Sequence, residues 1–503
     1  MNIITLGELK KSGYIQKSIK EEIRQNLIAR LEKGKESFPG IMGYEDSVIP
    51  DTERAILSRH NILFLGLRGQ AKTRMARQMI DLLDEYIPVV EGSEVNDDPL
   101  APMSTYAKEL IAVKGDETPI YWLHRSERYG EKLATPDVSV ADLIGDIDPV
   151  KAANLRLSFA DERVIHYGII PRSNRGIFVI NELPDLQARI QVALFNILQE
   201  GDIQIRGFKL RMPLDILFVF TANPEDYTNR GAIVTPLKDR IESQILTHYP
   251  KTVETALAIT EQEASIHPDQ EKKVVVSDLV KRLIEQVSFE ARGSEFVDQK
   301  SGVSARLTIA AFENAVSAAE RRSILNKEKK TQVWISDLTG IIPSITGKIE
   351  LVYEGEQEGP YQVSYNLLEK SIRTMFAQYF PNPEQLKKKK GKDGAAEENP
   401  FRRVISWFDK GNALNIFFNT KDADKIIQLY QVDGLHALVK KYFPQAGEAE
   451  NALLMEFVLH GLASYSLISK KVLEAKIEFK DLMGSMINLG SSGGYKDEED
   501  NDF

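Results

Sequence analysis

The feature that most constrains the fold is a short apolar run that leads through a glycine-containing loop into a helical segment. The apolar run is NILFLGL, the loop is Gly66-Leu67-Arg68-Gly69-Gln70-Ala71-Lys72-Thr73, and the segment TRMARQMIDLLDEY has helical periodicity. A buried parallel strand followed by a loop and a helix is half of a nucleotide-binding βαβ unit. This order predicts an α/β domain built on a parallel sheet with helices on both faces.

The loop matches the phosphate-binding pattern G-x-x-x-x-G-K-[ST], except that Ala71 stands in place of the second glycine. In that pattern backbone N–H groups at a helix N-terminus face the phosphate oxygens, a lysine faces the β- and γ-phosphates, and a hydroxyl binds magnesium. Lys72 and Thr73 supply the last two groups, and Gly69 can adopt a positive φ. The residues predicted to bind ATP are Gly66, Gly69, Gln70, Ala71, Lys72 and Thr73.

Two further apolar runs, GIFVINEL at 176–183 and DILFVFTANP at 215–224, are predicted to be parallel strands ending in polar residues. Ligands of open parallel sheets bind at the carboxyl ends of the strands. P-loop ATPases carry an aspartate there for magnesium and often a glutamate that orients water. Here Glu182 is present, but Asn181 replaces the aspartate. One unit charge pair at about 4 Å contributes roughly 4 kcal/mol, so we expect Asn181 to weaken magnesium retention and slow hydrolysis.

Two arginines follow the third run. In Pro236-Leu237-Lys238-Asp239-Arg240, the arginine is placed to project from a subunit edge and stabilise charge on a transferred phosphoryl group in trans. A surface pairing of Arg240 with Asp239 or Glu242 remains an alternative. In Gly302-Val303-Ser304-Ala305-Arg306, we expect Ser304 to cap a helix whose first turn holds Arg306. A first-turn arginine opposes the helix dipole, which favours a functional reason for it.

The periodicity along the chain predicts six segments. These are an N-terminal helical segment (1–37), an α/β nucleotide-binding domain (38–250), a helical lid (251–345), a linker-rich region (346–401), a helical C-terminal domain (402–485) and a disordered acidic tail (486–503). Within them we expect a small hairpin at 201–213, a linker at 354–361 and a long helix over 453–479.

The composition excludes or disfavours several kinds of site and several locations for the protein. The chain has 503 residues, no cysteine and a formal net charge of −10. Lack of cysteine excludes disulfides and thiolate metal sites, and the negative charge argues against nucleic-acid binding. The lysine run 387–390 is interpreted as part of a solvated linker. No apolar run is long enough to span a membrane and no secretory signal is recognisable, so we expect a cytoplasmic protein.

The segments GLRGQAKT, FVINE, TANP, LKDR and GVSAR occur in the order found in AAA+ ATPases. Residues 38–345 resemble the clade of the magnesium-chelatase small ATPase subunit and the MoxR-like chaperone ATPases, whose approach to the second strand is similar to GIIPRSNRGIFVINEL. The resemblance implies that Lys72 and Thr73 bind phosphate and magnesium and that Glu182 activates water. It further implies a first sensor at Asn223, a finger in trans at Arg240 (alternatively Arg230) and a second sensor at Arg306.

The resemblance implies a homo-oligomeric ring, with a hexamer favoured, that hydrolyses ATP to remodel a protein partner or to assist assembly of a complex or cofactor. Its client is an unknown protein or a separate partner subunit. Two alternatives stay open: an ATP-binding scaffold with little turnover, motivated by Asn181, and the ATPase subunit of a magnesium-chelatase-like metal-insertion complex. Residues 346–503 match no family that we can name.

Overall fold

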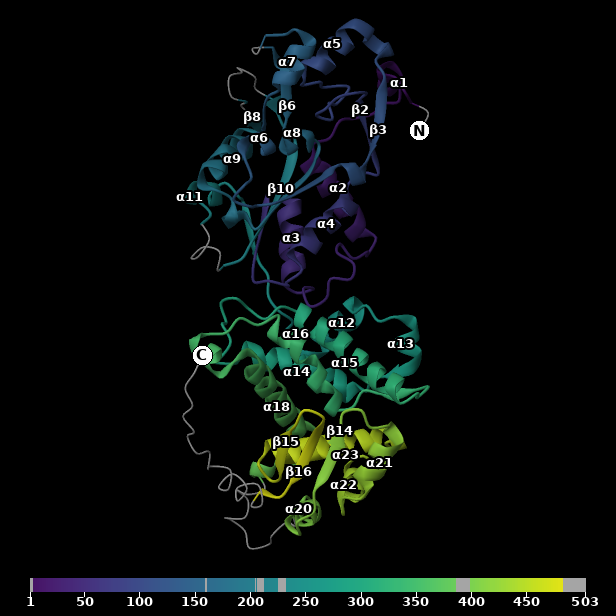
Figure 1. Ribbon diagram of the computed structural model, residues 1–503. Helices are drawn as coiled ribbons and strands as arrows, with labels where there is room; N and C mark the ends of the chain where they lie inside the picture. The colour runs from purple at the N-terminus through teal and green to yellow at the C-terminus, as the bar shows by residue number, and fades with distance from the viewer. Residues whose placement is uncertain are drawn as a thin grey trace, which may run out of the picture. The chain divides into compact units, whose positions relative to one another are not determined.

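The chain divides into two compact units, Met1–Tyr249 and Pro250–Phe503, in the computed structural model (Figure 1). The structure describes residues 3–158, 161–203, 205, 212–224, 232–385 and 399–482. Each unit buries hydrophobic clusters of its own.

A parallel sheet with the strand order β11-β1-β10-β7-β4 forms the centre of the first unit. Its strands are β1 (Ile62–Leu65), β4 (Tyr129–Leu133), β7 (Gly176–Asn181), β10 (Ile216–Ala222) and β11 (Ser243–Leu246). The three predicted strands are the three inner ones, so the predicted parallel α/β sheet is confirmed. The two edge strands were not predicted, because most of their residues are only partly buried and give a weak apolar signal.

Side chains of the inner strands alternate between the two faces of the sheet, and helices cover both faces. Phe178 and Phe218 lie on the face covered by α9 (Ala188–Glu200) and α11 (Thr235–Lys238). Val179 and Val219 lie on the opposite face, covered by α2 (Ile19–Glu32), α3 (Val48–Leu57) and α4 (Lys72–Gln78). The ribbon shows the two groups of helices on opposite sides of β10 (Figure 1). The predicted helices on both faces are therefore present.

The N-terminal helix belongs to this core. Ile19, Ile23 and Leu27 of α2 are buried against the sheet, whereas Ile15, ahead of the helix, and Leu31, near its end, are exposed. The buried Glu22 accepts two hydrogen bonds of 2.7 Å from Arg128, which precedes β4. Helix α2 is thus fixed to the sheet by both apolar packing and an ion pair.

Shorter elements surround the sheet. Three antiparallel pairs are β2 (Tyr86–Val90) with β3 (Ile120–His124), β5 (Gly145–Ile147) with β6 (Ile165–Tyr167), and β8 (Asp202–Ile203) with β9 (Met212–Pro213). The short helices are α1 (Leu6–Lys11), α5 (Thr105–Lys114), α6 (Val140–Leu143), α7 (Pro149–Leu155) and α8 (Ile169–Arg172). The hairpin predicted at 201–213 corresponds to β8 and β9; residues 204 and 206–211 lie outside the described part.

The second unit is mainly helical. Its helices are α12 (Val253–Glu263), α13 (Pro268–Lys273), α14 (Asp278–Arg292), α15 (Arg306–Leu325), α16 (Ile342–Thr346), α17 (Tyr353–Glu358), α18 (Pro360–Tyr379), α20 (Arg402–Asp409), α21 (Asp422–Tyr430), α22 (Leu435–Tyr442) and α23 (Glu448–Ser464). A parallel pair joins β12 (Val274–Val275) to β13 (Thr331–Gln332). An antiparallel sheet has the order β14 (Leu414–Phe417), β16 (Lys476–Lys480), β15 (Ser469–Val472).

Two sequence predictions are wrong here. The helix predicted over 453–479 ends at Ser464, and β15 and β16 follow. The segment KIEFK alternates partly buried and buried residues, a period of two that a helical assignment overlooked. The linker predicted at 354–361 is instead helix α17 and the start of α18, with Gly359 between them at φ 92°. Gly359 ends α17 and caps the start of α18, so it separates two consecutive helices and is not part of a linker.

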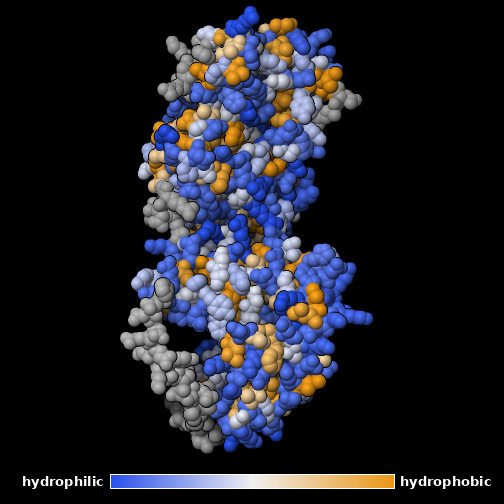
Figure 2. Space-filling view, in the orientation of Figure 1, coloured by the Kyte–Doolittle hydropathy of each residue, from blue (hydrophilic) through white to orange (hydrophobic). Residues whose placement is uncertain are grey.

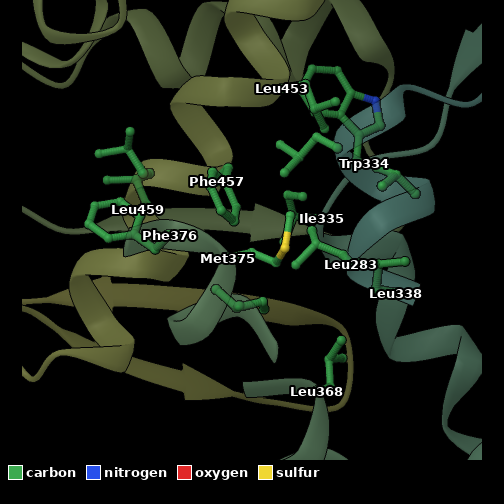
Figure 3. Close-up of a cluster of buried hydrophobic side chains, with 14 of the residues drawn as sticks. Leu283, Trp334, Ile335, Leu338, Leu368, Met375, Phe376, Leu453, Phe457 and Leu459 are labelled. Carbon is green, nitrogen blue, oxygen red and sulfur yellow. The ribbon is translucent and has the colours of Figure 1, made fainter. Parts of the chain in front are cut away.

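One hydrophobic cluster runs through the second unit from Val274 to Phe479. Figure 3 shows Trp334 and Ile335 facing α23, from which Leu453 and Phe457 project, with Met375 of α18 between them. Every residue of α23 from 451 to 462 is buried, as expected for a helix surrounded by other elements. The predicted lid and the C-terminal region therefore share a core. The boundaries 251–345, 346–401 and 402–485 stay predictions.

None of the helices within the described ranges combines the length and apolar character needed to cross a bilayer. On the face shown in Figure 2, hydrophobic residues are scattered in small groups among hydrophilic ones.

Candidate functional site

The loop between β1 and α4 has the backbone that its sequence pattern requires. Gly69 has a φ of 71°, and Ala71 has a φ of 55° in the left-handed region. A side chain at Gly66 would collide with Thr247 and with the side chain of Gln70. Gly66 is therefore required by close packing and Gly69 suits a positive φ, whereas Ala71 adopts a conformation that L-residues disfavour.

Lys72 lies inside this loop with its side chain directed back along it. Its ammonium donates hydrogen bonds to the carbonyl oxygens of Gly66 and Leu67, the latter at 3.1 Å, and to Oδ1 of Asn223 at 2.6 Å. The residue is 7% exposed. A buried cation surrounded by oxygen acceptors at the end of β1 is suited to holding an anionic group that displaces them.

Glu182 and Asn223 meet at the carboxyl ends of β7 and β10. The side-chain amide of Asn223 donates to Oε2 of Glu182 at 2.9 Å, and the backbone N–H of Glu182 donates to Oγ1 of Thr221 at 3.1 Å. Glu182 has a φ of 56° and a ψ of 49°. A left-handed glutamate directly after a buried strand is the kind of backbone strain that is often found at functional sites.

Asn181 lies beside the loop threonine. Its Oδ1 atom accepts hydrogen bonds from Thr73 Oγ1 at 3.3 Å and from Thr221 Oγ1 at 3.1 Å. Its Nδ2 atom donates to Oε1 of Glu131 at 2.6 Å. The structure thus brings together five of the predicted site residues, Lys72, Thr73, Asn181, Glu182 and Asn223, within one hydrogen-bond network.

Sequence reasoning missed Glu131 on β4. Arg77 of α4 donates to both of its carboxylate oxygens, at 2.9 and 3.0 Å, and the Tyr129 hydroxyl donates to Oε2 at 3.0 Å. Burial alone would raise the pKa of Glu131, but the hydrogen bonds from Arg77 and Tyr129 and the charge of Arg77 outweigh it and lower the pKa. Both oxygens of Glu131 thus act as hydrogen-bond acceptors. Glu131 could have been identified only by assigning YGEKL as an edge strand beside β7.

Two tyrosines hold the loop from outside. The Tyr44 hydroxyl donates to the carbonyl oxygens of Gln70 and His248, both at 2.9 Å, and the Tyr249 hydroxyl donates to the Arg68 carbonyl at 2.8 Å. Burial raises the pKa of Tyr44 well above its usual value, so the hydroxyl stays a donor. The side chain of Gln70 accepts from Thr247 Oγ1 at 2.7 Å. Hydrogen bonds to the Gln70 backbone and to its side chain thus both stabilise the conformation of the loop.

Arg240, which lies in the same unit, does not join this network. Arg240 donates to Gln199 at 3.0 and 2.8 Å and to the Pro236 carbonyl at 2.7 Å, and lies 5.1 Å from the Phe195 ring centre. These contacts, made along α9 and α11, replace the predicted surface pairing with Asp239 or Glu242. Arg306 is the first residue of α15 in the second unit and is exposed. The cap of α15 is Ala305, not Ser304 as predicted; Ser304 Oγ accepts from the Arg306 N–H at 3.1 Å. Arg230 lies outside the described residues.

The first unit is an α/β domain with helices on both faces of a parallel sheet, and it carries a phosphate-loop sequence pattern after β1 and an asparagine-glutamate pair after β7. In sequence the chain is similar to the magnesium-chelatase 38 kDa subunit. It is 25% identical over 201 residues to the subunit of Cereibacter sphaeroides, covering 39% of this chain and 54% of the relative. It is 26% identical over 226 residues to that of Rhodobacter capsulatus, covering 44% and 59%.

The chain thus spans little more than half the length of these curated relatives. No protein-family profile matches it. Among solved structures, it is similar to a complex of the magnesium-chelatase subunits BchI and BchD, at 19% identity and a TM-score of 0.33, covering 64% of this chain and 98% of that one. A RuvB variant from Thermotoga maritima is similar at 11% identity and a TM-score of 0.33, covering 72% and 78%.

Proposed function

We propose that this chain binds ATP with magnesium and hydrolyses it. The observation that carries the proposal is the single network that joins the buried Lys72 ammonium, the Thr73 hydroxyl and the side chains of Asn181, Glu182 and Asn223. One cation, one hydroxyl, two side-chain amides and one carboxylate at the ends of adjacent strands fit a magnesium nucleotide. Magnesium needs few protein ligands, because phosphate oxygens and water complete its shell.

In this proposal Lys72 binds the β- and γ-phosphates, while Thr73 and Asn181 hold the ion. Bound magnesium would neutralise charge on the phosphates. The Glu182 carboxylate orients the attacking water, and Asn223 fixes Glu182 through the 2.9 Å hydrogen bond of its amide. The left-handed backbone of Glu182 supports this role, because strained conformations of this kind concentrate at active sites.

We further propose a homo-oligomeric ring, hexameric by preference, in which Arg240 reaches the site of a neighbouring subunit and Arg306 acts from the lid. The work done would be remodelling of a protein partner or assistance in assembling a complex or cofactor, as in MoxR-like ATPases. The support is the order of the sequence motifs and the position of Arg240 away from the network of its own chain.

Two other functions each have one observation in their favour. Asn181 lacks the charge of the usual aspartate, which favours an ATP-binding scaffold with little turnover. Similarity to magnesium-chelatase 38 kDa subunits favours the ATPase subunit of a metal-insertion complex. Fold similarity does not fix the client, since function depends on the site and its partners.

Calorimetric titration of the full chain with ATP and magnesium, together with phosphate release, tests the proposal. Lys72→Ala should weaken ATP binding about 10- to 100-fold through loss of charge-assisted hydrogen bonds. Glu182→Gln should retain binding and lower turnover by a factor on the order of 10² or more. Lys10→Ala, which removes an exposed ion pair of the same unit, is the matched control. Absence of ATP binding by the wild type would overturn the proposal. Binding with turnover insensitive to Glu182→Gln would favour the scaffold.

A further inference from the structure

The orientation of the Asn181 amide is determined by its neighbours. Both oxygens of the Glu131 carboxylate accept hydrogen bonds from Arg77, so the Asn181 group that faces Glu131 at 2.6 Å is its NH₂ donor. The amide oxygen consequently faces the hydroxyl groups of Thr73 and Thr221. Glu131 therefore decides which atom of Asn181 is presented to the loop threonine that magnesium is expected to contact.

The sheet places Glu131 where this contact can form. Strand β4 pairs with β7 in parallel, with Leu133 opposite Asn181 and Glu131 opposite Val179. Residues two apart on a strand lie on the same face, so Glu131 and Asn181 are diagonal neighbours on one face of the sheet. The contact follows from the register of two adjacent strands.

We propose that Glu131 supplies the negative charge that position 181 lacks, acting through Asn181 as a positioning residue for the magnesium ion of the bound nucleotide. This inference rests on the proposed function. Glu131, which is paired with Arg77, brings to this edge of the sheet the carboxylate that an aspartate at 181 would itself provide. A carboxylate that accepts from the amide NH₂ polarises the amide and makes its oxygen a better acceptor for an ion or its water.

A simpler interpretation is that Glu131 only anchors helix α4 through Arg77. The Arg77 side chain is 62% exposed and that of Glu131 is 22% exposed. An ion pair of this exposure contributes little to stability, so its removal should leave the fold intact. Arg77→Gln removes the anchor and leaves the contact between Glu131 and Asn181, which separates the two interpretations.

The test measures the affinity of the full chain for ADP by calorimetry, once with magnesium and once with EDTA. The readout is the affinity with magnesium divided by the affinity with EDTA. No turnover is involved. Glu131→Gln keeps a hydrogen-bond acceptor for Asn181 and removes the charge, so the ratio should fall about 10-fold. The double variant Glu131→Gln with Asn181→Asp exchanges the acid and the amide and should restore the ratio to near the wild-type value. Arg77→Gln should leave the ratio within about twofold of wild type, because the exposed ion pair contributes little.

The ADP affinity in EDTA shows for each variant that the loop is folded. An unchanged ratio in Glu131→Gln, no recovery in the double variant, or an equal loss in Arg77→Gln would each overturn the role of Glu131. A wild type that binds no ADP in either condition would instead overturn the proposed function. If the wild type binds ADP tightly with magnesium and Glu131→Gln has the same affinity ratio as the wild type, only this inference is overturned.

Discussion

The Lys72 ammonium lies 2.6 Å from the Oδ1 atom of Asn223, while the Nδ2 atom of Asn223 lies 2.9 Å from Glu182. One amide thus accepts from the cation proposed to bind phosphate and donates to the carboxylate proposed to orient water. A side-chain amide is suited to this position because it is a donor and an acceptor at once. Phosphate that competes for Lys72 would release Oδ1 while the bond to Glu182 can persist.

Asn223→Ala should therefore affect turnover more than binding. Loss of the bond to Glu182 frees the carboxylate, and turnover should fall about 10- to 100-fold, as expected when a catalytic group is misplaced. ATP affinity should change less, because Lys72 and the loop remain. Phosphate release and calorimetry measure the two effects, and Asn412→Ala, at an exposed asparagine of the second unit, is the control. Equal turnover in Asn223→Ala and wild type would contradict the coupling.

Ala71→Gly should stabilise the first unit. A left-handed alanine costs about 1–2 kcal/mol, and glycine loses part of this gain through the greater freedom of the unfolded chain, so a net gain of about 0.5–1 kcal/mol is expected. Urea denaturation measures it. Lys327→Gly, at an exposed left-handed residue of the second unit, is the matched backbone control. This control lies outside the loop and should leave ATP affinity unchanged. A loss of stability in Ala71→Gly would show that the alanine methyl contributes packing.

Arg240→Ala should retain ATP binding and lose most turnover, by a factor on the order of 10³ if the arginine stabilises the transferred phosphoryl group. Mixing Arg240→Ala with Lys72→Ala provides a sharper readout. In a mixed ring a Lys72→Ala subunit offers an intact Arg240 to a neighbour that can still bind ATP. Phosphate release should then exceed that of either variant alone. A mixture no more active than its components would place Arg240 outside the site.

The second unit should lose stability as the pH rises from about 4.5 to about 7. Burial raises the pKa of Glu285 from 4.5 to about 7, against opposing effects of Thr260, Thr308 and Arg292. A carboxyl group whose pKa is raised by folding stabilises fully below its unfolded pKa, and the contribution of about 3 kcal/mol is lost as pH passes the folded pKa. Glu285→Gln should remove this loss and make the unit more stable than wild type at pH 8. Urea denaturation of both proteins at pH 5 and pH 8 measures the difference.

The inner sheet and the loop could be predicted because their signals are local. Residues 62–65, 177–180 and 216–220 are continuous apolar runs, and polar residues follow the last two where ligands of parallel sheets bind. The same reasoning placed Asn181, Glu182 and Asn223 at one edge of the sheet, and the structure joins them by hydrogen bonds. Their chemical roles stay predictions.

Glu131 could not be found in the same way. Its strand is partly exposed, and its significance depends on pairing with a strand that begins more than forty residues later. The C-terminal sheet was missed for a related reason, since β14 pairs with β16 across three intervening helices. Pairings between distant segments are set by the packing of the whole unit, and local periodicity does not record them.

The two tyrosine hydroxyls on the phosphate loop have a mechanical consequence. Tyr44 connects the Gln70 carbonyl to His248, and Tyr249 itself holds the Arg68 carbonyl. His248 and Tyr249 are the last residues before the chain passes into the second unit. Movement of the loop carbonyls would therefore alter hydrogen bonds made by Tyr44 and Tyr249 next to the last residues of the first unit.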